Sequence, residues 1–247
     1  MTRVVLVHGS VANAAMTFAQ QRPLADRFEL VWHTRSGYPP RPPLAAIDFE
    51  DQAAELEREL QAGDHVVGHS YGAVVSLLAA ATREDLGSLT VAEPPAFGVA
   101  LGHPAVRDFL RKIQPFTTED PKEYLDFFLP LVGSRLRSGL QATAAKPPSR
   151  GRKTGARELS PELEQGARAA MAERPPNEAE IPFAALRGMP YPKLVISGGH
   201  SAAFDAVCDV LERELAAERA VVPGAGHSIA RAPGFNDVLV DFLERAS

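Results

Sequence analysis

The chain has 247 residues, enough for one large domain with an insertion, and its apolar fraction of 45% is ordinary for a globular protein. The mild net charge of −5 argues against a nucleic-acid-binding protein, and no apolar run reaches the roughly 18 residues of a membrane span. The single cysteine, Cys208, excludes an internal disulfide and is typical of a reducing compartment. We therefore expect a cytoplasmic protein that binds neither nucleic acid nor membrane.

The first half of the chain alternates between strand and helix patterns. Apolar, β-branched runs predict buried strands at residues 4–7, 28–32 and 65–67. Helical spacing predicts helices over residues 13–25, interrupted by Pro23, and over 48–60, with Asp48 as N-cap. This alternation predicts an α/β fold with a mostly parallel, doubly wound sheet.

The third strand runs straight into Gly68-His69-Ser70-Tyr71-Gly72, which fits the pattern G-x-S-x-G. A small, apolar, helix-prone segment follows it. A strand that turns directly into a helix strains the middle residue, and the flanking glycines relieve clashes across so tight a turn. The sequence therefore predicts that the Ser70 hydroxyl projects from the turn as a nucleophile.

Beyond this turn the strand pattern lapses and then returns. Further strands are expected at 89–92, 193–197 and 220–222, and helices at 106–113, 121–132, 161–173, 201–215 and 235–243. We predict a core formed by residues 1–96 and 188–247, with a helical cap over 97–187. Within the cap, the basic segment 141–157 is expected to be a solvated loop rather than an anion-binding arm.

A serine nucleophile needs a base and donors for an oxyanion. His227 is the candidate base, because it lies in the glycine-rich loop that follows the last strand. The oxyanion donors are expected to be the backbone amides of Tyr71 and of Ser10 or Val11. The Ser10 hydroxyl could add a donor. His8 is expected to shape the oxyanion turn and His69 to point away from Ser70, and no motif surrounds the remaining histidines at 33, 65, 103 and 200.

The order and spacing of His8-Gly9, the Ser70 motif and Gly224-Ala225-Gly226-His227 resemble the α/β-hydrolase superfamily. The resemblance covers nearly the whole chain and is greatest to small, cap-bearing members, including actinobacterial hydrolases of unassigned substrate. It implies an α/β-hydrolase fold and serine hydrolase chemistry with no cofactor and no metal. The same fold also hosts lyases, transferases and receptors.

The acid of the expected triad departs from the family pattern. Family members commonly carry Asp after the penultimate strand, where this chain has Ser201. A second family solution places the acid after the strand that follows the Ser70 helix, and Glu93 fills that position. A carboxylate directly after a buried strand is rarely an idle charge, so we predict the triad Ser70, His227 and Glu93. Asp205 is the alternative acid, and an ion pair at the cap hinge is the alternative role of Glu93.

We thus predict hydrolysis of an ester, lactone or thioester of a small, largely apolar molecule through an acyl-enzyme. The alternatives are a lyase, an acyltransferase or a cyclase using the same site, or a small-molecule receptor. Haloalkane dehalogenase and epoxide hydrolase are disfavoured, because those relatives need Asp in place of Ser70. Cap aromatic residues are expected to form core rather than pocket, at positions 109, 116, 124, 127 and 128, and Glu178 and Glu180 to be exposed. The partner is expected to be a small-molecule substrate, and the protein a monomer or homodimer.

Overall fold

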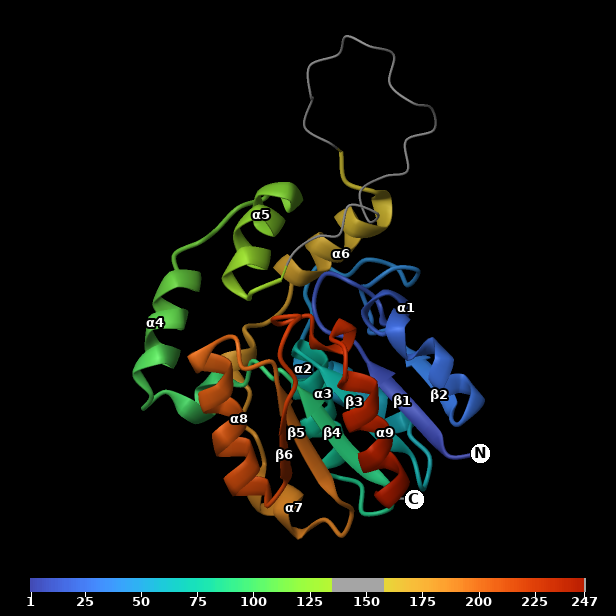
Figure 1. The fold of residues 1–247 in the computed structure, drawn as a ribbon. Helices are drawn as coiled ribbons and strands as arrows, with labels where there is room; N and C mark the ends of the chain where they lie inside the picture. Colours follow the sequence, from blue (N-terminus) through green and yellow to red (C-terminus); the bar gives the residue numbers. More distant parts are fainter. Residues whose placement is uncertain (135–157, 247) are drawn as a thin grey trace.

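The computed structural model describes residues 1–134 and 158–246 (Figure 1). Within these residues, six parallel strands form one sheet in the order β2-β1-β3-β4-β5-β6. Their bounds are β1 Arg3–Val7, β2 Glu29–His33, β3 His65–His69, β4 Ser88–Ala92, β5 Lys193–Ser197 and β6 Glu218–Val221. Because the chain adds β2 on one side of β1 and then β3 on the other, the loops after β1 and β3 diverge at the carboxyl edge of the sheet. Such a switch point is where ligand sites form in open α/β sheets.

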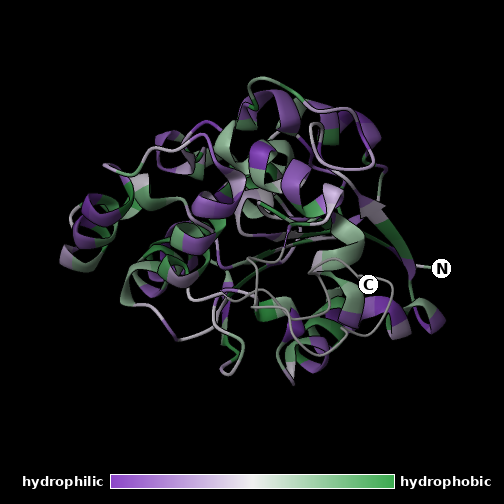
Figure 2. Cartoon of the chain, turned by 90° about the horizontal axis from the view of Figure 1, so that it is seen from above, coloured by the Kyte–Doolittle hydropathy of each residue, from purple (hydrophilic) through white to green (hydrophobic). Residues whose placement is uncertain are grey.

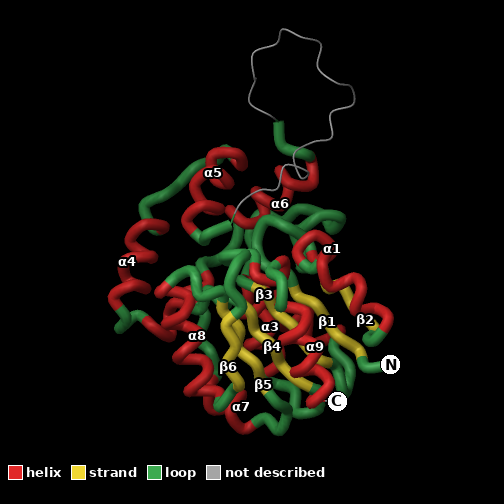
Figure 3. The backbone as a smooth tube through the Cα atoms, viewed as in Figure 1, coloured by secondary structure: helices red, strands yellow, loops and turns green. Residues whose placement is uncertain are grey.

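Helices cover both faces of this sheet, and β1, β3 and β5 are mostly apolar and buried (Figures 2 and 3). One face packs against α2 (Phe49–Glu59), α3 (Tyr71–Ala80) and α8 (Ala202–Leu215). The other face packs against the 3-10 segment Ala19–Asp26 and α9 (Phe235–Ala246). Two separate apolar clusters result, one on each side, as expected for strands buried on both faces. The predicted α/β fold with a parallel, doubly wound sheet is therefore confirmed.

In the described part of the segment between β4 and β5, the regular elements are helices joined by loops. It contains α4 (Pro104–Ile113), α5 (Pro121–Leu131), α6 (Pro161–Met171) and α7 (Phe183–Gly188). The first three lie beyond the carboxyl ends of the strands (Figure 1). A parallel bridge between Ile47 and Glu173 ties the end of this segment to the core. The predicted basic loop 141–157 lies outside the described residues.

Most predicted elements occur within one to three residues of their expected bounds, and the helix predicted over 13–25 is wrong. The chain there forms α1 (Ala14–Thr17) and then the 3-10 segment that contains Pro23. Proline lacks the N–H that an α-helix needs at this position, which favours the tighter, shorter turns observed. Asp48 caps α2 as predicted, since its side chain accepts from the Glu50 N–H at 2.7 Å. None of the helices in the described part of the chain is long and apolar enough to cross a membrane.

Candidate active site

Ser70 occupies the sharp turn between β3 and α3. Its backbone has φ 56° and ψ −127°, a left-handed conformation that is strained for a residue with a side chain. The turn lies against β1 so closely that a Cβ at Gly72 would stand 2.3 Å from the His8 carbonyl oxygen. The glycines of the motif are therefore required by close backbone packing, which fixes the position of the Ser70 hydroxyl.

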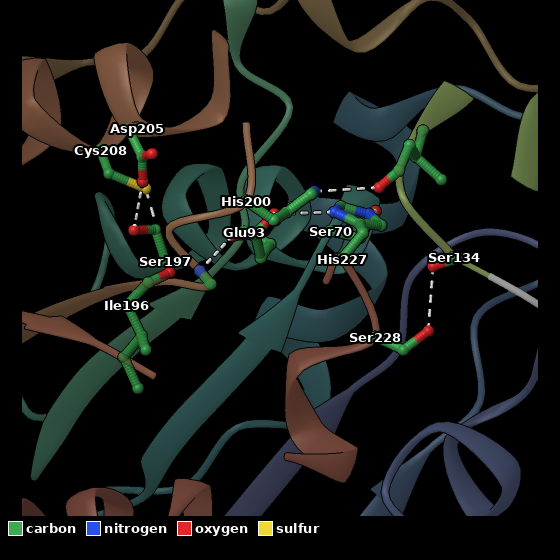
Figure 4. A network of polar contacts seen from close by, with 12 residues as sticks. Ser70, Glu93, Ser134, Ile196, Ser197, His200, Asp205, Cys208, His227 and Ser228 are labelled. Atoms are coloured by element: carbon green, nitrogen blue, oxygen red, sulfur yellow. Dashed lines mark hydrogen bonds and ion pairs between the residues drawn. The ribbon is translucent and has the colours of Figure 1, made fainter. Parts of the chain in front are cut away.

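The structure brings Ser70, His227 and Glu93 together from three distant parts of the chain (Figure 4). The Ser70 hydroxyl lies 2.7 Å from His227 Nε2, and His227 Nδ1 lies 3.0 Å from Glu93 Oε2. All three side chains are buried. With Nδ1 protonated and donating to Glu93, Nε2 is free to accept the serine proton, which is the arrangement needed in a serine hydrolase.

Glu93 directly follows β4 and is completely buried. Its second oxygen, Oε1, accepts from the Gly198 N–H at 2.5 Å, so both oxygens are hydrogen-bonded. Burial raises the pKa of Glu93, and the Gly198 hydrogen bond opposes that rise by stabilising the carboxylate. Glu93 also has a positive φ of 53°, a strained conformation that turns its side chain toward the histidine loop.

Asp205, the alternative acid, lies in a different network. It accepts from the Ser197 hydroxyl at 2.5 Å and stands 3.6 Å from the Arg219 guanidinium. Figure 4 shows Asp205 beside Ser197 and Cys208, separated from His227 by Glu93. The geometry therefore favours Glu93 over Asp205 as the partner of His227.

The loop that carries His227 is held against neighbouring segments on several sides. His69 Nε2 donates to the His227 carbonyl oxygen at 2.7 Å, so His69 holds the histidine loop through its backbone. A Cβ on Gly226 would lie 2.2 Å from the Gly133 carbonyl oxygen, and the hydroxyls of Ser134 and Ser228 are 2.9 Å apart. The end of α5 is thus packed directly on the histidine loop.

Sequence reasoning assigned no role to His200, yet it lies beside the three-residue chain. Its Nδ1 is 3.7 Å from Glu93 Oε2, and its Nε2 donates to the Val132 carbonyl oxygen at 3.1 Å. The position of His200 directly after Gly198-Gly199, in the loop where relatives carry their acid, was the available sequence signal. His200 therefore links Glu93 to the end of α5.

Burial lowers the pKa of His227 below its usual 6.5, because the charged imidazolium loses hydration. A base must be neutral, so we expect kcat/KM for a 4-nitrophenyl ester to stay high as the pH falls to 6.5. It should drop only at lower pH, with an acid limb whose midpoint lies below 6.5. A pH–rate profile checks this, with circular dichroism at each pH to exclude unfolding. An acid limb centred at or above 6.5 would contradict the assigned environment.

The predicted oxyanion donors lie on both sides of Ser70. The Tyr71 N–H begins α3, where the first helical N–H groups have no partner within the helix. Gly9 packs closely on the turn that carries Ser70, because a Cβ on Gly9 would be 2.6 Å from Ser70 Cβ. This packing brings the next residue, Ser10, beside the nucleophile. His8 holds this loop as expected, since its Nε2 accepts from the Arg35 N–H at 3.0 Å.

The Ser10 hydroxyl is not an oxyanion donor in this structure. It donates instead to Glu173 Oε2 at 2.5 Å. Of the groups of Ser10, the backbone amide remains as a candidate oxyanion donor. The prediction that the Ser10 hydroxyl donates to the oxyanion is therefore wrong. Its proton is used by the buried carboxylate of Glu173.

The oxyanion loop is clamped by α6. Val11 has a positive φ of 73°, unusual for a β-branched residue, and a Cβ on Gly166 would lie 1.9 Å from the Val11 carbonyl oxygen. Gly166→Ala must therefore move α6 or the loop. We expect a loss in kcat of about 10- to 100-fold, because small displacements of transition-state donors are costly.

Steady-state kinetics of Gly166→Ala test this clamp against Gly188→Ala. A Cβ at Gly188 would meet no atom within 4 Å, so this control should keep wild-type kcat. Wild-type kcat in Gly166→Ala would show that the contact does not position the loop.

Two cavities meet at Ser70 and His227. The larger, of about 340 Å³, is lined mainly by apolar and aromatic side chains. The smaller, of about 80 Å³, lies on the side of Met16 and Arg231. Four of the five cap aromatics expected to be simply core line the larger cavity, namely Phe109, Phe116, Tyr124 and Phe128. Phe109 is also part of the main buried apolar cluster, so for this residue the core expectation is confirmed. Phe127 stacks on Phe116 with ring centroids 3.8 Å apart.

Other predicted residues have simpler surroundings. Glu178 and Glu180 are exposed as expected, and Glu178 pairs with Arg174 at 3.0 Å. No group of three or more His, Cys, Asp or Glu side chains within the described residues is arranged to hold a metal ion.

Solved structures share this architecture at low sequence identity. An esterase from Thermogutta terrifontis is similar with a TM-score of 0.63 and 19% identity, covering 100% of this chain and 90% of that one. NosK from Streptomyces actuosus is similar with a TM-score of 0.61 and 20% identity, over 100% and 99% of the two chains. Est816, described as an N-acyl homoserine lactone degrading enzyme, has a TM-score of 0.66 and 17% identity, over 98% and 93%. These likenesses establish the fold.

Curated protein sequences give no significant match. The sequence profile of the alpha/beta hydrolase family, in contrast, matches residues 4–235, which includes nearly all of the sheet and the whole Ser70–His227–Glu93 arrangement. This match agrees with the family resemblance seen in the sequence. The chain therefore belongs to the alpha/beta hydrolase family and is an enzyme of the hydrolase type.

Proposed function

We propose that this enzyme hydrolyses an ester, lactone or thioester of a small, largely apolar molecule through an acyl-enzyme on Ser70. The observation that carries the proposal is the continuous hydrogen-bonded chain Ser70–His227–Glu93 at the mouth of a mostly apolar cavity of about 340 Å³. That volume accommodates a small organic molecule. The partner is accordingly a small-molecule substrate.

In the first half-reaction, Ser70 Oγ attacks the carbonyl carbon while its proton passes to His227 Nε2. The carbonyl oxygen becomes an oxyanion, stabilised by the Tyr71 and Ser10 amides. His227 then gives the proton to the leaving alcohol or thiol, and the acyl group remains on Ser70. Glu93 keeps the imidazole in the tautomer that exposes Nε2 and stabilises the imidazolium as it forms.

In the second half-reaction, His227 takes a proton from water, which attacks the acyl-enzyme. The same amides stabilise the second oxyanion, and the proton returns to Ser70 Oγ as the acid product leaves. The N-acyl lactone named for the similar structure Est816 is a cyclic ester and fits this scheme, so lactones belong in the substrate screen.

Intact-mass analysis after treatment with a fluorophosphonate tests the proposal. We expect one adduct on the wild-type protein and none on Ser70→Ala, because the phosphonate reacts with an activated serine. A panel of 4-nitrophenyl esters, thioesters and lactones then measures turnover. Ser70→Ala should lower kcat by at least about 10⁴-fold.

A folded wild-type protein that gains no adduct would contradict an activated Ser70. An adduct without hydrolysis of any panel member, but with transfer of the acyl group to an added alcohol or amine, would replace hydrolysis with acyl transfer.

We also propose that residues 97–187 act as a cap and that the enzyme works in the cytoplasm as a monomer or homodimer. Support for the cap comes from α4, α5 and α6, whose side chains supply much of the cavity lining. Support for a reducing compartment comes from the single, buried thiol of Cys208.

A further inference from the structure

A second buried carboxylate, Glu173, lies beside the reaction site and has no part in the mechanism above. It follows α6, its side chain is 6% exposed, and it lines the same cavity as Ser70 and Ser10. Burial raises the pKa of Glu173, while an ion pair and three hydrogen bonds oppose that rise. A carboxylate buried at this cost needs either a structural or a recognition role.

Arg35 supplies the countercharge to this carboxylate. Its guanidinium is fully buried between the rings of Tyr38 and Tyr71, 4.7 and 4.5 Å from their centroids, and forms an ion pair with Glu173. The Tyr38 hydroxyl donates to Glu173 Oε1 at 2.7 Å. Because Arg35 balances its charge, Glu173 offers the cavity a hydrogen-bond acceptor without a net negative charge.

Ser10 extends this acceptor toward the nucleophile. Its only hydroxyl proton is donated to Glu173 Oε2, so Ser10 Oγ presents lone pairs alone. Glu173 has about four lone-pair sites and uses three for Arg35, Tyr38 and Ser10. The corner formed by Ser10 and Glu173 can therefore accept hydrogen bonds and cannot donate them from its side chains.

This acceptor corner is close to the reacting carbonyl and lies in an apolar setting. The Ser10 amide is a predicted oxyanion donor. The Ser10 side chain therefore lies close to the position expected for the scissile carbonyl. The rest of the cavity wall is mainly apolar, with aromatic side chains from Phe97, Phe109, Phe116, Phe128 and Phe204. A buried acceptor in such a wall favours a ligand that donates and penalises one that leaves it unpaired.

We propose that Ser10 and Glu173 form a subsite for an uncharged hydrogen-bond donor, a hydroxyl or an N–H, carried one or two atoms from the scissile carbonyl. The inference rests on the proposed ester hydrolysis and names its substrate class: esters, lactones or thioesters with a 2-hydroxy or 2-acylamino group and an apolar or aromatic body. Glu173 acts here as a specificity-determining residue and takes no proton in the reaction.

The test compares two 4-nitrophenyl esters, of 2-hydroxy-2-phenylacetic acid and of 2-methoxy-2-phenylacetic acid. The methyl ether keeps the oxygen and loses only the donor hydrogen. We expect wild-type kcat/KM to be about tenfold or more higher for the hydroxy ester, as for a hydrogen bond to a charged acceptor. The ratio should fall toward one in Glu173→Gln and in Ser10→Ala, because each variant disrupts the acceptor pair.

Glu178→Gln is the matched control, since Glu178 is an exposed carboxylate on the same segment and pairs with Arg174. It should keep the wild-type ratio. If Glu173→Gln does not fold, Ser10→Ala still decides the question, because it removes one small side-chain group and retains the backbone amide. Equal kcat/KM for the two esters, or a ratio unchanged in Ser10→Ala, would overturn the subsite and leave ester hydrolysis standing.

A readout without turnover separates the two proposals. The ketones 1-hydroxy-1-phenylpropan-2-one and 1-methoxy-1-phenylpropan-2-one should protect Ser70 from fluorophosphonate labelling, the hydroxy ketone at about tenfold lower concentration. That preference in an enzyme that hydrolyses neither these esters nor any member of the ester, thioester and lactone panel would support the subsite and overturn the proposed reaction. Equal protection by the two ketones would overturn the subsite whatever the turnover.

Discussion

Replacing Glu93 with Gln is expected to lower kcat by about 10³- to 10⁴-fold, while the protein stays folded. The Gln side chain keeps the size of Glu93 and can still accept from the Gly198 N–H. It removes the charge that stabilises the imidazolium, and its amide N–H₂ can face His227 Nδ1 and stabilise the wrong tautomer. Steady-state kinetics on a 4-nitrophenyl ester, with thermal unfolding as the folding check, measure the effect.

Asp205→Asn provides the matched control for this experiment. Asp205 makes its contacts with Ser197 and Arg219, so the same loss of charge there should leave kcat within a fewfold of wild type. Full turnover in Glu93→Gln beside an inactive Asp205→Asn would reverse the assignment of the acid. Full turnover in both would remove the need for any carboxylate behind His227.

Replacing Arg35 with Met is expected to lower the free energy of unfolding by about 3–5 kcal/mol. Arg35 is completely buried and is the ion-pair partner of Glu173, so its removal leaves a buried carboxylate without a countercharge. The Met side chain retains much of the apolar length between the two tyrosine rings. Equilibrium unfolding in urea measures the change, provided the slope of the transition stays the same.

A double-mutant cycle sharpens this prediction. Glu173→Gln in the Arg35→Met background should recover part of the lost stability, because a neutral amide costs less to bury than an unpaired charge. Arg245→Met, which removes exposed ion pairs with Glu218 and Asp241, serves as the surface control and should change stability little. An Arg35→Met protein as stable as that control would mean that water reaches Glu173 and solvates it.

The residues that the sequence could place are those whose position follows from a strand end. Ser70, Glu93 and His227 each follow a predicted strand, and parallel strands bring their carboxyl ends to one edge of the sheet. The strand-end position of Glu93, together with the family resemblance, predicts it as the acid. The nearest alternative, Asp205, lies on a helix face, where local spacing says little about reach.

Glu173 could not be found in the same way. It lies 163 residues from Ser10 and 138 from Arg35, and it belongs to no motif that carries chemistry. Its role depends on how the returning segment after α6 packs on the core, which local patterns do not encode. Several cap aromatics were likewise misjudged, because helical spacing identifies an apolar face without saying whether protein or a cavity faces it.

The contact between Gly166 and the Val11 carbonyl bears on how this protein could be re-engineered. Exchanging caps between relatives is an obvious route to new specificities, since the cap supplies much of the cavity wall. Here the inserted segment and the catalytic scaffold meet backbone to backbone, so a transplanted cap would need a residue without a side chain at the matching helical position. A chimera that ignores this requirement should fold with its nucleophile intact and yet be a poor catalyst.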